Sequence, residues 1–560
     1  MGISTAARGE VELSGLDEAL LENALIHLSL DDEQCDAVSW QIEDQFSNAE
    51  DEIRTSLEAL GYYAAEVESS LHFDDACWVA NFDVVAGDPV ILREVDIAIS
   101  GAASDDTEFL RVIERFELVS GRILHHGRYT SLKNALLDLS LERGYMEAQY
   151  DTARIDVFPP EHAADLTLRL DSGPRYTFGA IEIDQAILDR DLLERYYEFD
   201  SGDPYDRNEL NQLYLSLVGS GYFDSIDVRP LPEDASSKTV PVLIRLTPAA
   251  RRSATYGVGF STDTGPRIRA GATNRRLNTR GSQVGVNGQL SPVISEVLVN
   301  YRFPYGDPRS EWVSFDAGIK HEDTETAVSD SVEFGVRRVL SRSGGWQETQ
   351  FLNSLVENFV VGTEKSRSRL LTPGVSWLKV SADDALRPAS GYRVGIELSG
   401  ASDTIGSDTS FLQLMVDGKW IRSFRNQGRV LVRGRLGAIW EDDFIELPPS
   451  VRFFAGGDDS IRGYKFESLG PLDADGNVIG GNRLAVASIE YEHPIRERWS
   501  IAFFADAGNA YRNGEFSTVS GVGAGFRWHS PLGPIRFDVA FPQDGDDQDV
   551  RFHISLGADL

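Results

Sequence analysis

Charged residues of both signs recur in the last third of the chain, within segments that alternate apolar and polar residues. A lone cation stands in the glycine-rich stretch 451–471, in the sequence Ile461-Arg462-Gly463-Tyr464. Further charges follow at Glu490, Asp506, Arg527, Arg536 and Asp538. An arginine can bind a carboxylate through two parallel N–H groups, which lysine cannot reproduce. These residue types therefore predict an internal ion cluster that locks a loop in place.

The apolar neighbours of these charges predict that the charges point to one side of a sheet. Phe503 and Ala505 share one face of a strand and leave Asp506 on the other, because side chains alternate with a period of two. The same alternation applies to the three strands that carry the other four charges. Four consecutive strands are thus predicted to present all five charges to one interior space.

The stretch 451–471 is too long for an ordinary connection between two strands, which needs only a few residues. Its apolar residues, among them Phe453, Phe454 and Ile461, argue against disorder. We therefore expect the stretch to fold into the interior, where Arg462 meets the carboxylates. In this interpretation Arg462, with Gly463 and Tyr464, holds the structure together and does not move.

Other chemistry is poorly supported by the sequence. The glycines of Gly521-Val522-Gly523-Ala524-Gly525 do not match a dinucleotide-binding loop, since the third glycine is one position early. They predict a bare inward face that makes room for the loop. The histidines lack zinc-ligand spacing, and no Gly-x-Ser-x-Gly elbow of an esterase is found. The sequence predicts no metal, no cofactor and no enzymatic activity.

The two halves of the chain differ in charge and composition. Residues 1–250 hold 50 Asp and Glu against 18 Lys and Arg, a net charge of −32. The totals of 89 and 53 leave 39 acidic and 35 basic residues for the remainder, a net charge of −4. Glycine shifts as well, with 14 of 51 before residue 251. We expect a domain boundary near residue 250, and an acidic first half that does not bind nucleic acid.

Segments that target proteins to membranes are not apparent. No run of about eighteen apolar residues predicts a transmembrane helix, and the first residues have no apolar core of a signal peptide. Two cysteines, Cys35 and Cys77, lie in the first hundred residues. Two interpretations of them remain open: separate buried thiols, or a disulfide that an oxidising compartment permits.

The first 250 residues contain a diffuse repeat. A helical pattern ends in Gly61-Tyr62-Tyr63, in Gly144-Tyr145-Met146 and in Gly221-Tyr222-Phe223, where glycine suits the end of a helix. A strand pattern follows each time. The repeated unit is predicted to be β-α-α-β-β, about eighty residues long. Three generic α+β domains would also explain this pattern.

From Thr255 to Leu560 the period is two throughout, in sixteen alternating segments. Short alternating strands without helices between them predict a closed antiparallel barrel. In the last segment Phe552, Ile554 and Leu556 share one face, and Arg551 and His553 share the other. A soluble sandwich or propeller remains an alternative, but the inward set is too charged for a dry core. A transmembrane barrel is therefore favoured.

The repeats resemble POTRA domains, the polypeptide-transport-associated modules of outer-membrane assembly proteins. The motif RFFAGGDDSIRGY at Arg452–Tyr464 and the segment Phe503–Gly508 are similar to the TamA family within the BamA-like superfamily. Gly257–Arg267 and Gly521–Asp538 support the resemblance. It implies POTRA domains at 10–90, 91–172 and 173–249, and a barrel at 250–560 with an inserted loop at 451–471. It also implies that Arg462 meets Asp506 inside the barrel, with Glu490 close by.

The resemblance implies an outer-membrane assembly factor with periplasmic POTRA domains. Its expected partners are the outer-membrane bilayer, unfolded barrel substrates such as autotransporters, and an inner-membrane-anchored protein of the TamB type at the first POTRA domain. Substrates would enter at a lateral seam between the first and last barrel strands. The residues of this seam are expected to be Tyr256, Val258, Phe260, Phe552, Ile554, Leu556 and Gly557.

Two other functions remain open from the sequence. A two-partner secretion pore shares the loop and barrel motifs, but it usually carries two POTRA domains and a plug helix. A passive outer-membrane channel explains the barrel, but it explains neither the repeats nor the loop around Arg462.

Overall fold

The computed structural model describes residues 9–74, 77–232, 237–384, 387–424, 428–530, 533–544 and 549–556. By its internal contacts, the chain divides into two compact parts. The first runs up to Asp184 and also holds Glu198–Leu213 and Asp227–Ile244. The second holds Gln185–Tyr197, Tyr214–Ile226 and the chain from Arg245 onward. The third repeat is therefore divided between these two parts of the chain.

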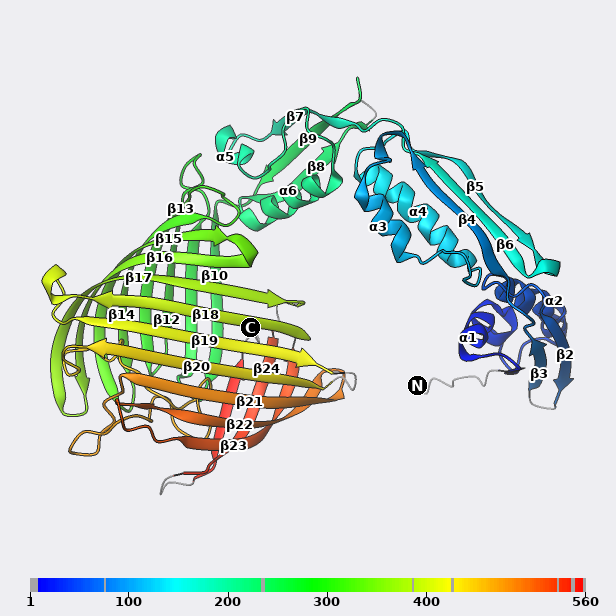
Figure 1. The fold of residues 1–560 in the computed structure, drawn as a ribbon. Coiled ribbons are helices and arrows are strands. Elements are labelled where there is room, and N and C mark those ends of the chain that lie inside the picture. The colour runs from blue at the N-terminus through cyan, green and yellow to red at the C-terminus, as the bar shows by residue number, and fades with distance from the viewer. Residues whose placement is uncertain are drawn as a thin grey trace. The chain divides into compact units, whose positions relative to one another are not determined.

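The first half of the chain folds into three successive β-α-α-β-β units, which confirms the predicted order (Figure 1). The first unit consists of β1 (Glu10–Ser14), α1 (Glu18–His27), α2 (Ser39–Glu58), β2 (Glu66–Phe73) and β3 (Trp78–Val85). The second consists of β4 (Ile91–Ser100), α3 (Thr107–Arg115), α4 (His126–Glu142), β5 (Gln149–Phe158) and β6 (Ala163–Asp171). The third consists of β7 (Thr177–Asp184), α5 (Arg190–Glu194), α6 (Arg207–Ser220), β8 (Phe223–Pro230) and β9 (Thr239–Pro248).

Each unit buries one face of a three-stranded sheet beneath its helices. The last strand of each unit lies in the middle of its sheet, in the orders β1-β3-β2, β4-β6-β5 and β7-β9-β8. In β3, Trp78, Phe82 and Val84 are buried at alternate positions, as expected for a half-buried strand. They form one core with Ile53 and Leu57 of α2.

A disulfide joins Cys35 to Cys77 in the first unit. It closes a loop of 42 residues between the region before α2 and the start of β3. Of the two interpretations of the cysteines, the structure therefore supports the disulfide and not two separate thiols. Such a bond stabilises a small domain mainly by restricting its unfolded chain.

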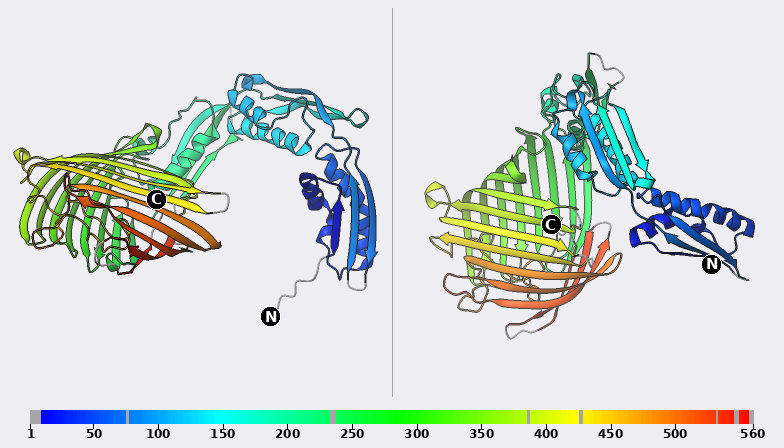
Figure 2. Two further views of the ribbon diagram at one scale, coloured as in Figure 1. Left: turned by 60° about the horizontal axis from the view of Figure 1, so that its bottom comes forward. Right: turned by 45° about the vertical axis from the view of Figure 1, so that its right-hand side comes forward.

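The rest of the chain forms sixteen antiparallel strands, as predicted. They are β10 (Arg252–Ser261), β11 (Gly265–Asn274), β12 (Gln283–Leu290), β13 (Ile294–Pro304), β14 (Trp312–Asp323), β15 (Ala327–Arg342), β16 (Trp346–Val361), β17 (Glu364–Ala382), β18 (Ser390–Ala401), β19 (Phe411–Ser423), β20 (Arg429–Glu441), β21 (Arg483–Arg496), β22 (Trp499–Tyr511), β23 (Val519–Ser530), β24 (Gly533–Pro542) and β25 (Arg551–Leu556). Each strand pairs with the next in sequence, and Figure 2 shows them following one another around the barrel.

Side chains alternate between the outside and the inside of this barrel. Phe503 is 54% exposed, whereas its neighbour Phe504 is 5% exposed and faces inward. Apolar residues on the outside and polar residues inside are typical of a barrel in lipid. Among the described residues, no helix is both long and apolar enough to cross a membrane.

The inserted loop is longer than predicted. It runs from residue 442 to residue 482, between β20 and β21, and is named the lumen loop here. The expected range of 451–471 was too short at both ends. After residue 471 the chain turns back, with a bridge between Leu472 and Val478 and another between Phe453 and Gly481. This region pairs within the loop and does not extend β21.

Candidate functional site

The side chain of Arg462 lies inside the barrel and binds carboxylates from three strands. Its Nε and Nη2 donate to the two carboxylate oxygens of Asp506 on β22, at 2.7 and 2.9 Å. Its Nη1 donates to Glu490 on β21 at 2.6 Å and to Asp538 on β24 at 3.2 Å. The two parallel bonds to Asp506 are the geometry that only arginine can supply.

A second arginine lies on the other side of the same carboxylates. Arg527 of β23 donates to Glu490 at 2.6 Å and to Asp538 at 2.6 Å. Glu490 and Asp538 therefore each bridge two arginines. We refer to Arg462, Glu490, Asp506, Arg527 and Asp538 as the ion cluster.

The ion cluster is largely shielded from solvent. Arg462 is 4% exposed, and the other four members are also buried. The guanidinium of Arg462 lies 3.5 Å from the centre of the Phe504 ring, which adds a cation–π contact. A buried charge without a partner is costly, so removing one member would leave its partners uncompensated.

The residues around Arg462 also match their surroundings closely. Gly463 has a φ of 101°, in the left-handed region that favours glycine. A Cβ at Gly521 would lie 2.0 Å from the carbonyl oxygen of Arg462, so the bare strand face lets the loop approach. The hydroxyl of Tyr464 lies within hydrogen-bond distance of the carbonyl oxygens of Ser520 and Asp544, at 3.2 and 3.0 Å.

Arg536 faces the same interior. It lies opposite Arg527 in the register of β23 and β24. It lines a small cavity of about 50 Å³ together with Arg462, Glu490 and Asp538. The predicted inward direction of all five strand charges thus agrees with where the structure places them.

The sequence reasoning missed a third arginine, Arg433 of β20. Its guanidinium donates to the backbone carbonyls of Asp458 and Ser460 in the lumen loop, both at 3.1 Å. It also lies 3.7 Å from the carboxylate of Asp506. Arg433 alternates with the apolar residues of β20, so the pattern that predicted Arg527 could have found it.

Apolar contacts and one further arginine hold the base of the lumen loop. Phe453, Ala455 and Ile461 are buried in a cluster with residues of β19, β20 and β21. Arg452 donates to the carbonyls of Leu447, Ile479 and Ile445, at 2.8, 3.0 and 2.8 Å. Because these carbonyls belong to both arms of the loop, Arg452 joins the two arms.

Within the described part of the chain, the first and last strands of the barrel meet without a ladder. There, each end strand of the sheet, β10 and β25, pairs with one neighbour only. In the described residues, the backbone contact between the two edges is between Thr262 and Ile554. The Thr262 N–H donates to the Ile554 carbonyl at 3.3 Å, and the Ile554 N–H donates to the Thr262 hydroxyl at 3.2 Å. We call this junction the seam.

Most side chains expected at the seam point outward. Tyr256 and Val258 are 84% and 85% exposed, and Phe260, Phe552 and Leu556 are also exposed. Ile554 is half-buried and contributes its backbone groups to the seam. Gly557 lies outside the described residues.

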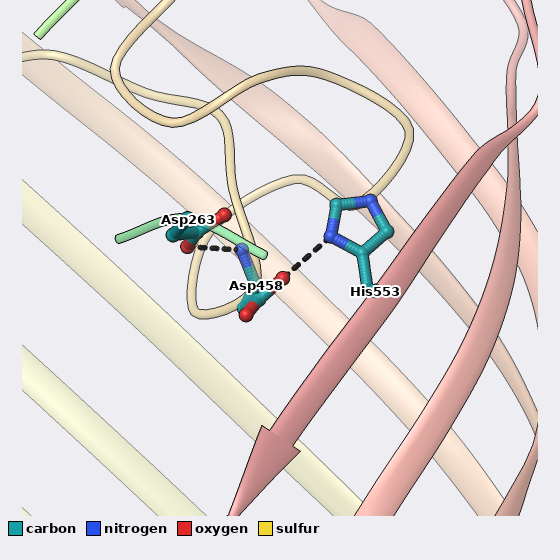
Figure 3. Close-up of side chains that lie close together, drawn as sticks. All are labelled: Asp263, Asp458 and His553. Carbon is teal, nitrogen blue, oxygen red and sulfur yellow. Dashed lines mark hydrogen bonds and ion pairs between the residues drawn. The ribbon is translucent and has the colours of Figure 1, made fainter. Parts of the chain in front are cut away.

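Three side chains of metal-ligating type lie close together near the seam, although the sequence predicted no metal site. Their ligand atoms, from Asp263, Asp458 and His553, lie within 4.8 Å of one another (Figure 3). Each is hydrogen-bonded to the protein. Nothing in their arrangement calls for an ion.

Comparison with known proteins places this architecture in a family. Residues 273–560 match the Omp85 superfamily domain, and residues 10–86 match the first POTRA domain of TamA. The outer membrane protein assembly factor BamA of Nitratidesulfovibrio vulgaris is 23% identical over 446 residues, covering 75% of this chain and 56% of that protein. BamA of Neisseria meningitidis is 24% identical over 482 residues, covering 73% and 60%. The chain thus spans somewhat more than half the length of these relatives.

A solved structure has a similar fold. BamA from Haemophilus ducreyi lacking POTRA domains 1–3 superimposes with a TM-score of 0.67 at 16% identity, covering 84% of this chain and 99% of that one. At this identity the likeness concerns the fold alone. The domain match covers more than half of the chain and includes most of the barrel, the ion cluster and the whole lumen loop. The chain belongs to the Omp85 superfamily.

Proposed function

We propose that this protein assembles β-barrel proteins into the bacterial outer membrane, with its barrel in the bilayer and its three β-α-α-β-β units in the periplasm. The observation that carries the proposal is the seam. In the described residues, the edges of β10 and β25 are joined by Thr262 and Ile554 and not by a ladder. The similarity to BamA proteins supports the same function.

The physical basis is strand exchange. Backbone N–H and C=O groups without partners are costly in lipid, so an open sheet edge there accepts a new strand readily. A barrel whose end strands are weakly joined can expose such an edge at little cost. An unfolded substrate strand would pair with it through main-chain hydrogen bonds, largely independent of its sequence.

The three N-terminal units would capture substrates before insertion. In the first sheet β1 and β2 lie at the edges, and equivalent edges occur in the other two. Exposed edges can add a guest strand. We propose POTRA domain boundaries at 10–90, 91–172 and 173–249, with the barrel from 250 onward. β4 begins at Ile91, β7 at Thr177 and β10 at Arg252, near these boundaries.

We further propose a role of the TamA type, with autotransporters among the substrates and a TamB-like protein at the first unit. This finer assignment is supported by the match of residues 10–86 to the first POTRA domain of TamA. In this view the ion cluster keeps the lumen loop inside the barrel while the seam opens. The proposed mechanism requires no cofactor and no catalytic residue.

A reversible covalent bond across the seam tests the assembly function. The double variant Thr262→Cys, Ile554→Cys replaces the two residues whose backbones are bonded across it. When oxidised, it should keep a folded barrel but lose insertion of a barrel substrate into liposomes. Reductant should restore insertion, so the reduced variant is the matched control.

Unchanged insertion by the oxidised variant would remove the seam from the mechanism. Export of a soluble substrate through the oxidised barrel would instead support a two-partner secretion pore. Heat-modifiability on gels reports folding independently in both states.

A further inference from the structure

Three segments that are distant in sequence meet beside the seam (Figure 3). Asp263 lies in the turn between β10 and β11, Asp458 lies in the lumen loop, and His553 lies on β25. The backbone N–H of Asp458 donates to the Asp263 carboxylate at 2.8 Å. The Asp458 carboxylate lies 2.5 Å from Nδ1 of His553.

The carboxylate of Asp458 also binds the first strand. Its two oxygens accept hydrogen bonds from the hydroxyls of Ser261 and Thr262, at 3.1 and 3.0 Å. One side chain of the lumen loop thus contacts both edges of the seam. Hydrogen bonds to a carboxylate are stronger than those between neutral groups.

The protonation of His553 follows from its two partners. Its Nε2 accepts the backbone N–H of Gly463 at 3.0 Å, so Nε2 carries no proton. Nδ1 must then carry the proton that it donates to Asp458. The imidazole therefore binds the lumen loop at two points, one of them next to Arg462.

The tip of the lumen loop connects Asp458 to the ion cluster. The Gly457 N–H donates to the Tyr464 carbonyl at 3.2 Å, which closes the tip into a compact turn. Arg433 donates to carbonyls within the same turn. Asp458 and Arg462 consequently belong to one compact turn, in which Asp458 contacts the seam and Arg462 contacts the ion cluster.

We infer that Asp458 is a positioning residue that holds β10 and β25 together, so that the seam is closed only while Asp458 is docked between them. The contact joins the two edges where the described residues of β10 and β25 form no ladder. Release of Asp458 from the two edges and opening of the seam are then one equilibrium, and Arg462 can stay in the ion cluster throughout. The inference concerns the contact itself, and only its consequence for insertion rests on the proposed function.

Hydrogen exchange measures this coupling without any substrate. In purified full-length protein, Asp458→Ala should speed amide exchange in the segment 551–556 about tenfold, because the local opening free energy falls with the lost contacts. The matched control is Asp459→Ala, since the neighbouring Asp459 side chain is 94% exposed. Exchange in β21 and β22 should stay unchanged in both variants, which would exclude general unfolding.

A second substitution separates the hydrogen bonds from the bulk of the side chain. His553→Asn can keep both a donor and an acceptor, whereas His553→Leu keeps neither. Exchange in 551–556 should be slower in His553→Asn than in His553→Leu. Equal exchange in Asp458→Ala and Asp459→Ala would overturn the inference, even if substrate insertion at the seam were confirmed.

Discussion

The lumen loop contacts two regions of the barrel, and its contacts with one are much stronger than its contacts with the other. Toward β21–β24, Arg462 meets buried carboxylates on strands that pair in continuous ladders. Toward the seam, Asp458 meets hydroxyls and an imidazole on two edges that share no ladder among the described residues. The same loop is therefore anchored firmly on one side and lightly on the other.

We therefore expect the two sets of contacts made by the lumen loop to have different roles. Breaking the buried ion cluster would leave several charges without partners, which costs more than separating the single Asp458 carboxylate from its hydroxyl and imidazole partners. The seam can therefore open while Arg462 stays in place only if Asp458 first releases the two edges. A barrel that opens only at the seam needs loop contacts that are weaker at the seam than at the ion cluster.

The largest expected effect comes from the ion cluster. Arg462→Ala should lower the stability of the docked loop by about 3–5 kcal/mol, because it leaves buried carboxylates uncompensated. Arg462→Lys should lie between Arg462→Ala and the unsubstituted protein, since lysine cannot bind Asp506 through two parallel bonds. The measurement is the amount of folded barrel and its heat-modifiability midpoint.

The matched control for this change is Lys465→Ala in the same loop. Lys465 pairs with Glu325 at 2.5 Å, and both side chains are substantially exposed. Such a surface pair contributes about 0–1 kcal/mol. If the two alanine variants behaved alike, the ion cluster would not be what holds the loop.

A smaller effect is expected from filling the space beneath the loop. Gly521→Ala would place a Cβ 2.0 Å from the Arg462 carbonyl oxygen, so the loop backbone must shift. We expect a loss of about 1–3 kcal/mol, as for other overpacked sites, and faster amide exchange in residues 451–471. Gly434→Ala is the control, because a Cβ there would lie at an ordinary contact distance of 3.7 Å from the Val486 carbonyl oxygen. Equal exchange in the two variants would contradict close packing at Gly521.

The smallest effect is a pH dependence on the seam side. Burial, and then the nearby Asp458 carboxylate, raise the pKa of Asp263 to about 7. The docked state therefore binds this proton more tightly than an undocked turn with an ordinary carboxyl pKa. Docking is favoured fully below about pH 4 and loses this contribution as the pH rises through about 7.

Amide exchange of 551–556, corrected for its intrinsic rate, should thus rise between about pH 4 and pH 7 and level off above that. Asp263→Asn should flatten this dependence. The charged or titratable groups that face Asp263 are Asp458, Asp459, Glu467 and His553. An unaltered profile in Asp263→Asn would assign the dependence to one of these groups instead.

Much of the fold could be predicted because it rests on periodicity. Alternation over many residues specifies a strand and its inward face at once, so the sixteen strands and the directions of Glu490, Asp506 and Arg527 followed from pattern alone. Glycine followed by an aromatic residue indicated the ends of helices in the three units. Their φ values are positive at Gly61, Gly144 and Gly221, as such ends require.

Groups outside periodic segments could not be found in this way. Asp263 and Asp458 lie in a turn and a loop, where no repeat relates one side chain to another. The full extent of the lumen loop was also missed, because its pairing is internal and involves isolated bridges. The disulfide remained undecided, since cysteine spacing alone does not tell whether two thiols meet.

The three carbonyls bound by Arg452 determine how the lumen loop would travel if it left the barrel. Its two arms are tied at the base, and the bridge between Ala455 and Leu469 ties them again further in. The loop would consequently leave and return as a preassembled plug, not as a chain that unravels and refolds. Each return would then require only docking, without a new search through loop conformations.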